Sequence, residues 1–250
     1  MIRATALYKA FDGKPVLKEV NTTFEKGKTN LIIGQSGSGK TVFMKCLVGL
    51  VEPDNGDVFY DDINFTRLSL RARGRVREKM GMLFQGSALF DSLTVEENVI
   101  FPLEMFNKTM TKKEKLDRAQ FCLDRVNILN ANHLYPAEIS GGMKKRVAIA
   151  RAIANNPEYL FCDEPNSGLD PQTAIVIDNL ISEITKEFNM TTVINTHDMN
   201  SVMEIGDHVV FLYKGNLWWE GTSSEILTTG NKEVEEFVYA SELMRKLKTG

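Results

Sequence analysis

The most informative segment of this chain is Gly34-Gln35-Ser36-Gly37-Ser38-Gly39-Lys40-Thr41. It matches the pattern G-x-x-x-x-G-K-[ST], in which a glycine-rich loop connects a buried strand to a helix. Its surroundings agree, because a short β-branched run over 29–33 precedes it and an apolar helix is expected over 41–50. The alternative is a flexible glycine-serine turn, which would need neither a strand before it nor a helix after it. We therefore expect a phosphate-binding loop that opens a helix.

The residue types of this loop suit the binding of a nucleotide. Gly34, Gly37 and Gly39 let the backbone curl so that its N–H groups converge on phosphate oxygens, and the start of the helix adds its positive dipole. Lys40 can reach the β- and γ-phosphates, and the Thr41 hydroxyl can ligate Mg²⁺. The expected nucleotide-binding residues of the loop are Gly34, Gln35, Ser36, Gly37, Ser38, Gly39, Lys40 and Thr41.

Two carboxylates follow a second apolar run. The run over 159–162 ends in Asp163 and Glu164. Asp163 can hold a hydrated Mg²⁺, and Glu164 can point at the γ-phosphate and orient water as a base. An Asp-Glu pair alone is also common in solvated turns. Its position after an apolar strand and downstream of a phosphate loop favours the catalytic interpretation.

Strand and helix patterns alternate along the chain, which is typical of an α/β fold with a largely parallel sheet covered by helices. We expect strands over 29–33, 80–84, 159–162, 191–195 and 209–212 and near 217–219, and a turn over 54–56 before a strand over 58–60. We expect helices over 41–50, 95–103, 112–126, 143–154 and 172–188, and one amphipathic helix over 233–248. The helix-rich stretch from about 86 to 156 is interpreted as an insertion into the sheet core.

The composition of the 250 residues excludes several classes of protein. Hydrophobic residues at 43% and charged residues at 25% exclude a disordered or fibrous chain. The net charge of −3 provides no bulk positive charge for nucleic acid. Cys46, Cys122 and Cys162 are too few and too scattered for a disulfide framework or a zinc site. No apolar run approaches the ~18 residues that span a bilayer, and no signal pattern opens the sequence, so we expect a soluble, cytoplasmic chain.

The stretch Ile139-Ser140-Gly141-Gly142-Met143, with the basic residues after it, closely resembles the signature motif of ATP-binding-cassette (ABC) ATPases. Two glycines that open a helix make a second phosphate-binding end. The motif precedes Asp163, as it does in the family. A helix N-cap with glycine at a tight turn is the alternative. The resemblance implies that Ser140, Gly141 and Gly142 bind nucleotide.

Further residues resemble other ABC motifs. Gln85 is similar to the Q-loop glutamine, Asp170 to the end of the D-loop, His197 to the switch histidine that senses the γ-phosphate, and Phe11 to the aromatic residue that stacks on adenine. The resemblance implies catalytic roles for Lys40, Gln85, Glu164 and His197, Mg²⁺ binding by Thr41, Gln85 and Asp163, and ATP binding by Phe11 and Asp170. Some positions depart from the commonest pattern without removing a charged group, so hydrolysis is expected. They are Gln35, Ile139, Met143 and Asn166.

The resemblance covers nearly the whole chain and implies a P-loop NTPase fold of the ABC-ATPase type, with a RecA-like core, an antiparallel β subdomain and a helical insertion subdomain. The ATPase domain would span 1–225, with its core over 1–87 and 157–225 and its helical subdomain over about 88–156, and 226–250 would form a helical tail. ATP and Mg²⁺ are the implied cofactors. Two identical copies would pair head to tail, with ATP between the loop of one copy and the signature of the other. Transmembrane permease subunits are implied as partners, nucleic acid is not, and the chain would lie peripherally on the cytoplasmic face of the inner membrane.

Parts of the sequence also look like the ATPases of Mla-type, or MCE-associated, lipid transporters. These parts are the segment over 82–103, the Ser-Gly-Gly-Met end of the signature, and the tail segment over 232–238. The resemblance implies trafficking of phospholipid or another hydrophobic substrate, an MCE-type substrate-binding protein as a partner, and a tail that helps dimer contacts. For the tail, the alternative is a generic solvated helix. For the chain, the alternatives are the ATPase of another importer or exporter for amino acids or lipoproteins, a non-transport signalling ABC ATPase of the cell-division type, and a soluble nucleotide-dependent regulator.

Overall fold

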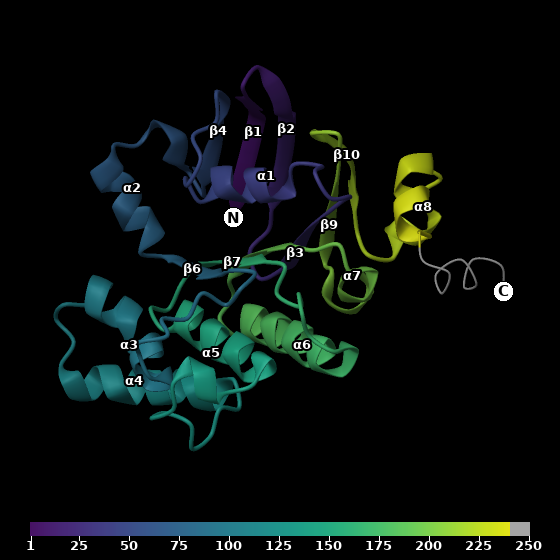
Figure 1. Ribbon diagram of the computed structural model, residues 1–250. Coiled ribbons are helices and arrows are strands. Elements are labelled where there is room, and N and C mark those ends of the chain that lie inside the picture. The colour runs from purple at the N-terminus through teal and green to yellow at the C-terminus, as the bar shows by residue number, and fades with distance from the viewer. Residues whose placement is uncertain (241–250) are drawn as a thin grey trace.

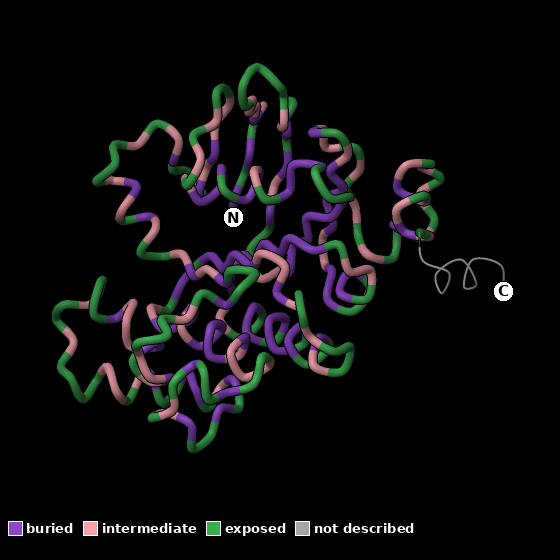
Figure 2. The backbone as a smooth tube through the Cα atoms, viewed as in Figure 1, coloured by how far each residue is buried: buried purple, intermediate pink, exposed green. Residues whose placement is uncertain are grey.

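The computed structural model describes residues 1–240, and a six-stranded sheet lies at its centre (Figure 1). In spatial order the strands are β10 (Asn216–Gly221), β9 (His208–Tyr213), β3 (Thr29–Ile33), β8 (Thr191–Asn195), β7 (Tyr159–Asp163) and β6 (Met80–Leu83). All neighbours pair in parallel except β10, which is antiparallel to β9. The inner strands β3, β7 and β8 are buried along nearly their whole length, as expected for a parallel sheet that is covered on both faces (Figure 2).

A second, antiparallel sheet covers one face of the central sheet together with the helix α1 (Lys40–Leu47) (Figure 1). Its strands, in spatial order, are β2 (Lys14–Phe24), β1 (Ile2–Phe11), β4 (Asn55–Tyr60) and β5 (Ile63–Asn64). The alternation of side chains along β3 divides the interior accordingly. Ile32 joins the core under the second sheet, whereas Leu31 and Ile33 join the core under the helices.

Helices cover the other face. Three of them lie between β6 and β7 in the chain and pack on one another: α3 (Val95–Phe106), α4 (Lys112–Arg125) and α5 (Gly141–Ile153). The helix α6 (Pro171–Glu187) follows β7, and the short α7 (Met199–Ile205) follows β8. Short 3₁₀ turns span Phe65–Arg67, Pro136–Glu138 and Glu225–Thr228. The predicted α/β class, with an antiparallel β subdomain and a helical insertion, is confirmed.

Some local predictions differ from the structure. Of the turn expected over 54–56, Asn55 and Gly56 instead begin β4. Gly56 has φ +83°, and a Cβ there would approach the Ala6 carbonyl oxygen to 2.3 Å, so the strand requires glycine at this position. The helix α2 (Leu70–Arg77) was not predicted, because it has almost no apolar periodicity. It is held instead by polar contacts, in which Arg73 pairs with the Glu52 carboxylate and Arg77 donates to the Gly49 carbonyl at 2.7 Å.

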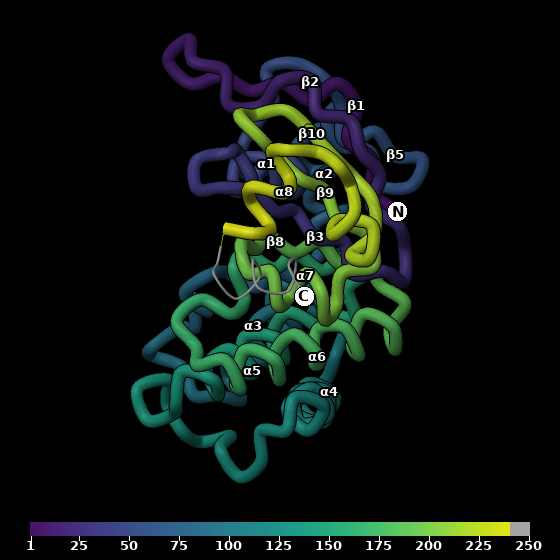
Figure 3. Tube along the Cα trace, turned by 90° about the vertical axis from the view of Figure 1, so that its right-hand side faces the viewer, coloured from purple at the N-terminus to yellow at the C-terminus, as the bar shows by residue number. Residues whose placement is uncertain are grey.

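The first part of the amphipathic helix expected over 233–248 is α8 (Lys232–Val238), and positions 241–248 lie outside the described residues. The helix folds back against β9 and β10 (Figure 3). The rings of Phe237 and Phe211 are 5.3 Å apart, and the Trp218 indole N–H donates to Glu233 at 3.2 Å. None of the helices within residues 1–240 is long and apolar enough to cross a membrane.

Candidate active site

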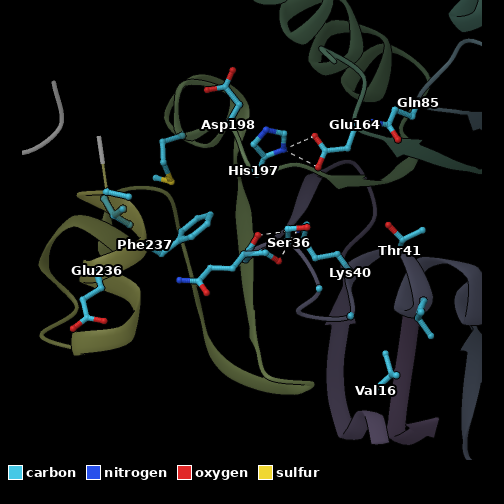
Figure 4. A pocket seen from close by; sticks show the side chains of 18 of the residues that line it. Val16, Ser36, Lys40, Thr41, Gln85, Glu164, His197, Asp198, Glu236 and Phe237 are labelled. Atoms are coloured by element: carbon cyan, nitrogen blue, oxygen red, sulfur yellow. Dashed lines mark hydrogen bonds and ion pairs between the residues drawn. The ribbon is translucent and has the colours of Figure 1, made fainter. Parts of the chain in front are cut away.

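The candidate site lies where β3, β7 and β8 end, because the carboxyl ends of parallel strands meet at one edge of the sheet. A cavity of about 1220 Å³ opens there (Figure 4). It brings together ten of the residues predicted from the sequence: Gly34, Gln35, Ser36, Gly37, Gly39, Lys40, Thr41, Gln85, Glu164 and His197. The loop, the Q-loop glutamine, the candidate base and the candidate switch histidine therefore share one site.

The loop has the backbone that the glycines predicted. Gly34, Gly37 and Gly39 have φ of +145°, +77° and +107°. A Cβ on Gly34 would lie 2.3 Å from the Leu212 carbonyl oxygen, so no larger residue fits without moving the loop. Within the described chain, no side chain caps the start of α1. Its first N–H groups are therefore not occupied by a side-chain cap and can donate to an anion, as expected for a phosphate site.

Lys40 lies inside this loop. Its ammonium donates to the carbonyl oxygens of Gly34, at 2.7 Å, and Gln35, at 3.2 Å. Burial lowers the pKa of the amine, and the nearby carboxylates of Glu164 and Asp163 act in the opposite direction. The amine is thus held beside the loop backbone, where bound phosphates would add negative charge.

The two carboxylates at the end of β7 are positioned by Asn195 on the neighbouring strand β8. The Asn195 amide donates to Asp163 at 3.0 Å, and the Glu164 N–H donates to the Asn195 carbonyl at 3.0 Å. Glu164 has φ +49°, a strained backbone for this residue type. The strained turn directs Glu164 into the cavity, while Asp163 lies just outside its lining.

His197 contacts the candidate base directly. Its Nδ1 lies 2.9 and 2.8 Å from the two carboxylate oxygens of Glu164 (Figure 4). The Glu164 side chain is 17% exposed, whereas the His197 ring is 69% exposed. The carboxylate is thus partly shielded from solvent, and the ring faces the open side of the cavity. A histidine in this position can orient the carboxylate and also reach a bound group.

The donor set at this edge fits Mg²⁺. Thr41 offers a hydroxyl, Gln85 an amide oxygen and Asp163 a carboxylate, which are the hard oxygen ligands that this ion takes together with water and substrate phosphates. The Gln85 amide nitrogen donates to the Ser167 hydroxyl at 3.3 Å, which leaves its oxygen available. Over residues 1–240 no cluster of His, Cys, Asp and Glu could hold a metal by itself. An ion here would be held largely by phosphates and water.

The signature residues lie away from this cavity. Among the described residues, Ser140, Gly141 and Gly142 are not part of its lining. Ser140 caps α5 by accepting from the Met143 N–H at 3.2 Å, so the motif does form the start of a helix. One copy of the chain therefore holds two separate parts of the predicted nucleotide site.

Three other predicted residues also lie outside the cavity lining. Ser38 is buried in the loop, and its hydroxyl has no hydrogen-bond partner within the described part of the chain. Asp170 caps α6, where it accepts from the N–H and hydroxyl of Thr173 at 3.0 and 2.5 Å, and these bonds lower its pKa. Phe11, at the end of β1, is 44% exposed, with the Lys9 ammonium 5.2 Å from its ring centre. Their roles toward ATP stay predictions.

Two contributions to the site were not predicted. Asn195 could have been found, because a polar residue that ends a buried strand beside the strand of Asp163 must share that sheet edge. The contribution of the tail could not have been predicted, because its sequence pattern does not indicate where α8 docks. Its residues Glu236, Phe237 and Val238 line the cavity next to the phosphate loop.

Comparisons with known proteins agree with this geometry. A family model described as "ABC transporter" matches residues 17–167. The methionine import ATP-binding protein MetN of Carboxydothermus hydrogenoformans is 40% identical over 244 residues, which are 95% of this chain and 71% of that protein. The probable ribonucleotide transport ATP-binding protein mkl of Mycobacterium tuberculosis is 32% identical over 240 residues, which are 95% of this chain and 66% of that protein. The chain thus spans about two thirds of the length of these relatives.

Solved structures show the same fold. The ATP-binding cassette MJ0796, in a dimeric post-hydrolysis state bound to ADP and Pi, is 33% identical with a TM-score of 0.81, covering 89% of this chain and 99% of that one. The structure of cbiO1 from Clostridium perfringens, part of an ABC transporter complex, is 28% identical with a TM-score of 0.85, covering 99% of this chain and 98% of that one. The chain therefore belongs to the ABC transporter family, in which it is an ATP-binding and ATP-hydrolysing subunit.

Proposed function

We propose that two copies of this chain close head to tail on two ATP molecules and that hydrolysis reopens the pair. This proposal rests on one observation: the signature does not line the cavity of its own chain. The phosphate loop of one copy therefore lacks the second phosphate-binding helix end that the family resemblance implies. In a C2 pair, Ser140, Gly141 and Gly142 of one copy would meet ATP held by Lys40 of the other. The dimeric state of the relative MJ0796 supports this arrangement.

Within the closed pair, the residues of the cavity divide the work of phosphoryl transfer. The loop N–H groups and Lys40 bind the phosphates. Thr41, Gln85 and Asp163 would hold Mg²⁺, which would supply positive charge against the phosphates when bound. Glu164 accepts a proton from the attacking water, and His197 orients Glu164 through the bond seen here and contacts the γ-phosphate. Phe11 would stack on adenine, and Asp170 would contribute to nucleotide binding.

Glu164→Gln tests this division of roles. The variant keeps the shape and polarity of the side chain and loses the base, so it should bind ATP, stop turning over and accumulate as a closed dimer. Size-exclusion chromatography with and without Mg-ATP, beside a steady-state ATPase assay, measures both effects. Wild-type turnover by the variant would refute the assignment of the base.

We further propose that the chain works with separate transmembrane permease subunits, bound to the cytoplasmic face of the inner membrane. The names of the relatives support an importer of a small molecule, since MetN is a methionine import protein in several bacteria. Lipid trafficking of the Mla/MCE type is the second candidate. It is favoured by the segment over 82–103 and by Met143 at the end of the signature.

Purification of the tagged chain in its native membrane complex separates the two cargo classes. A small-molecule importer predicts that the complex contains a binding protein for a polar solute, and that this solute stimulates ATP hydrolysis after reconstitution. Lipid trafficking predicts an MCE-type protein and bound phospholipid in the complex. A complex with no permease chain would contradict both transport proposals and favour a signalling ATPase.

A further inference from the structure

Asp178, Ser201 and the half-buried Asn166 form a polar cluster between α6 and α7, in which the Asp178 carboxyl group lies within hydrogen-bonding reach of the other two side chains. Asp178 is in the middle of α6 and only 3% exposed, and Ser201 in α7 is 1% exposed. Asn166 belongs to the loop between β7 and α6, and its amide donates to the Ser201 hydroxyl at 3.1 Å. One carboxylate oxygen of Asp178 and the amide oxygen of Asn166 have no hydrogen-bond partner among residues 1–240.

Such a cluster is unfavourable for folding. Burial raises the pKa of Asp178 to about 6, hydrogen bonding with Ser201 and Asn166 lowers it in part, and the negative charges of Asp198 and Glu204 raise it further. A well-packed apolar side chain at this position would avoid the desolvation of the carboxyl group. Stability alone therefore does not account for an aspartate here.

The position of the cluster relates it to catalysis. Asn166 lies two residues after Glu164. The next residue, Ser167, accepts a hydrogen bond from the Gln85 amide. Ser201 lies in the first turn of α7, the helix that follows His197. The cluster thus joins the loop that carries the candidate base to the helix that follows the candidate switch histidine. These two side chains contact each other, with His197 Nδ1 2.8 Å from the Glu164 carboxylate, so their alignment depends on how the loop and the helix are held.

We propose that Asp178 is a positioning residue for ATP hydrolysis, which holds the loop of Glu164 and the helix after His197 in register through Asn166 and Ser201. The inference rests on the proposed roles of Glu164 and His197. Asp178 is not among the residues that line the cavity. Its loss should therefore reduce the rate of the chemical step and leave ATP binding intact, because small misplacements of reacting groups lower the rate by large factors.

The experiment compares Asp178→Val, which removes both acceptor oxygens, with Asp178→Asn, which keeps one. Ser182→Ala is the matched control, because Ser182 is also buried in α6, one turn further on, and is not part of the cluster. For Asp178→Val we expect kcat about tenfold lower and KM for ATP within about twofold of wild type. Asp178→Asn should recover at least half of the wild-type kcat, and Ser182→Ala should keep it.

A double-mutant test adds the link to α7. Ser201→Ala should lower kcat as Asp178→Val does, and the double variant should lose little more, because both changes break one unit. A kcat for Asp178→Val within twofold of wild type, equal losses in Asp178→Val and Asp178→Asn, or losses that multiply in the double variant would each overturn the inference. So would a KM that rises together with a lower unfolding temperature, since this indicates general disruption.

Glu164→Gln measured in parallel separates this inference from the proposal on which it rests. If Glu164→Gln keeps wild-type turnover, the proposed base is wrong and the positioning role falls with it. If Glu164→Gln stops turnover and Asp178→Val does not change it, only the positioning role of Asp178 is wrong.

Discussion

The buried carboxyl group of Asp178 should make the stability of the fold depend on pH, and Asp178→Asn should remove that dependence. The side chain is 3% exposed, and its pKa is raised from 3.8 to about 6, chiefly by burial. A raised pKa means that the folded state prefers the neutral acid. The stability that this preference provides is fully present below the pKa of the unfolded chain and is lost as the pH rises through 6. Asparagine has nearly the same shape and does not titrate.

The size of the effect follows from the two pKa values. The full linkage between pH well below 3.8 and well above 6 is about 3 kcal/mol, since one pKa unit corresponds to about 1.4 kcal/mol. Between pH 5 and pH 8, this contribution to the free energy of unfolding falls by about 1.4 kcal/mol. The free energy of unfolding of Asp178→Asn, relative to wild type, should therefore rise by about 1.4 kcal/mol over that interval.

Urea unfolding of the nucleotide-free full chain, followed by circular dichroism at pH 5 and pH 8, measures this difference. Ser182→Ala serves as the control, because it changes a buried polar side chain of the same helix that does not titrate, so its difference from wild type should be the same at both pH values. A difference between Asp178→Asn and wild type that is equal at both pH values, or that falls toward pH 8, would refute the reasoning. It would mean that burial in the fold does not raise the pKa of Asp178 into this range.

Three further predictions follow from the site and the core. Lys40→Ala should lose nucleotide binding, because the loop loses its only charged donor in the described site; a titration with Mg-ATP that gives wild-type affinity would count against this. Gly34→Ala should weaken ATP binding and lower the free energy of unfolding by more than ~1 kcal/mol, because its Cβ meets a carbonyl oxygen at 2.3 Å; urea unfolding and the same titration check it. The cysteines should resist thiol reagents in the native protein, because burial raises the pKa of Cys46 to about 12, of Cys122 to about 11 and of Cys162 further still; one rapidly labelled thiol at neutral pH would disprove this.

Local patterns were enough to predict most of the elements and the residues at the phosphate loop. The β-branched run over 29–33 is β3, and the apolar stretch after the loop is α1, which begins at Lys40. Period and turn chemistry are properties of neighbouring residues, so they can be recognised without the rest of the chain. Parallel strands also end at one edge, so the carboxylates after β7 were expected near the loop after β3. The helix α2 was missed because local patterns do not show it. It is held by arginine contacts to distant parts of the chain.

Residue types at short spacing were sufficient to predict the α/β class, the phosphate loop over 34–41 and the carboxylates at Asp163 and Glu164. The docking of α8 at the cavity and the burial of Asp178 beside Asn166 and Ser201 emerged only from the three-dimensional packing. These features depend on which distant segments pack together. That choice is set by the burial of whole helix and sheet faces, which no short pattern encodes.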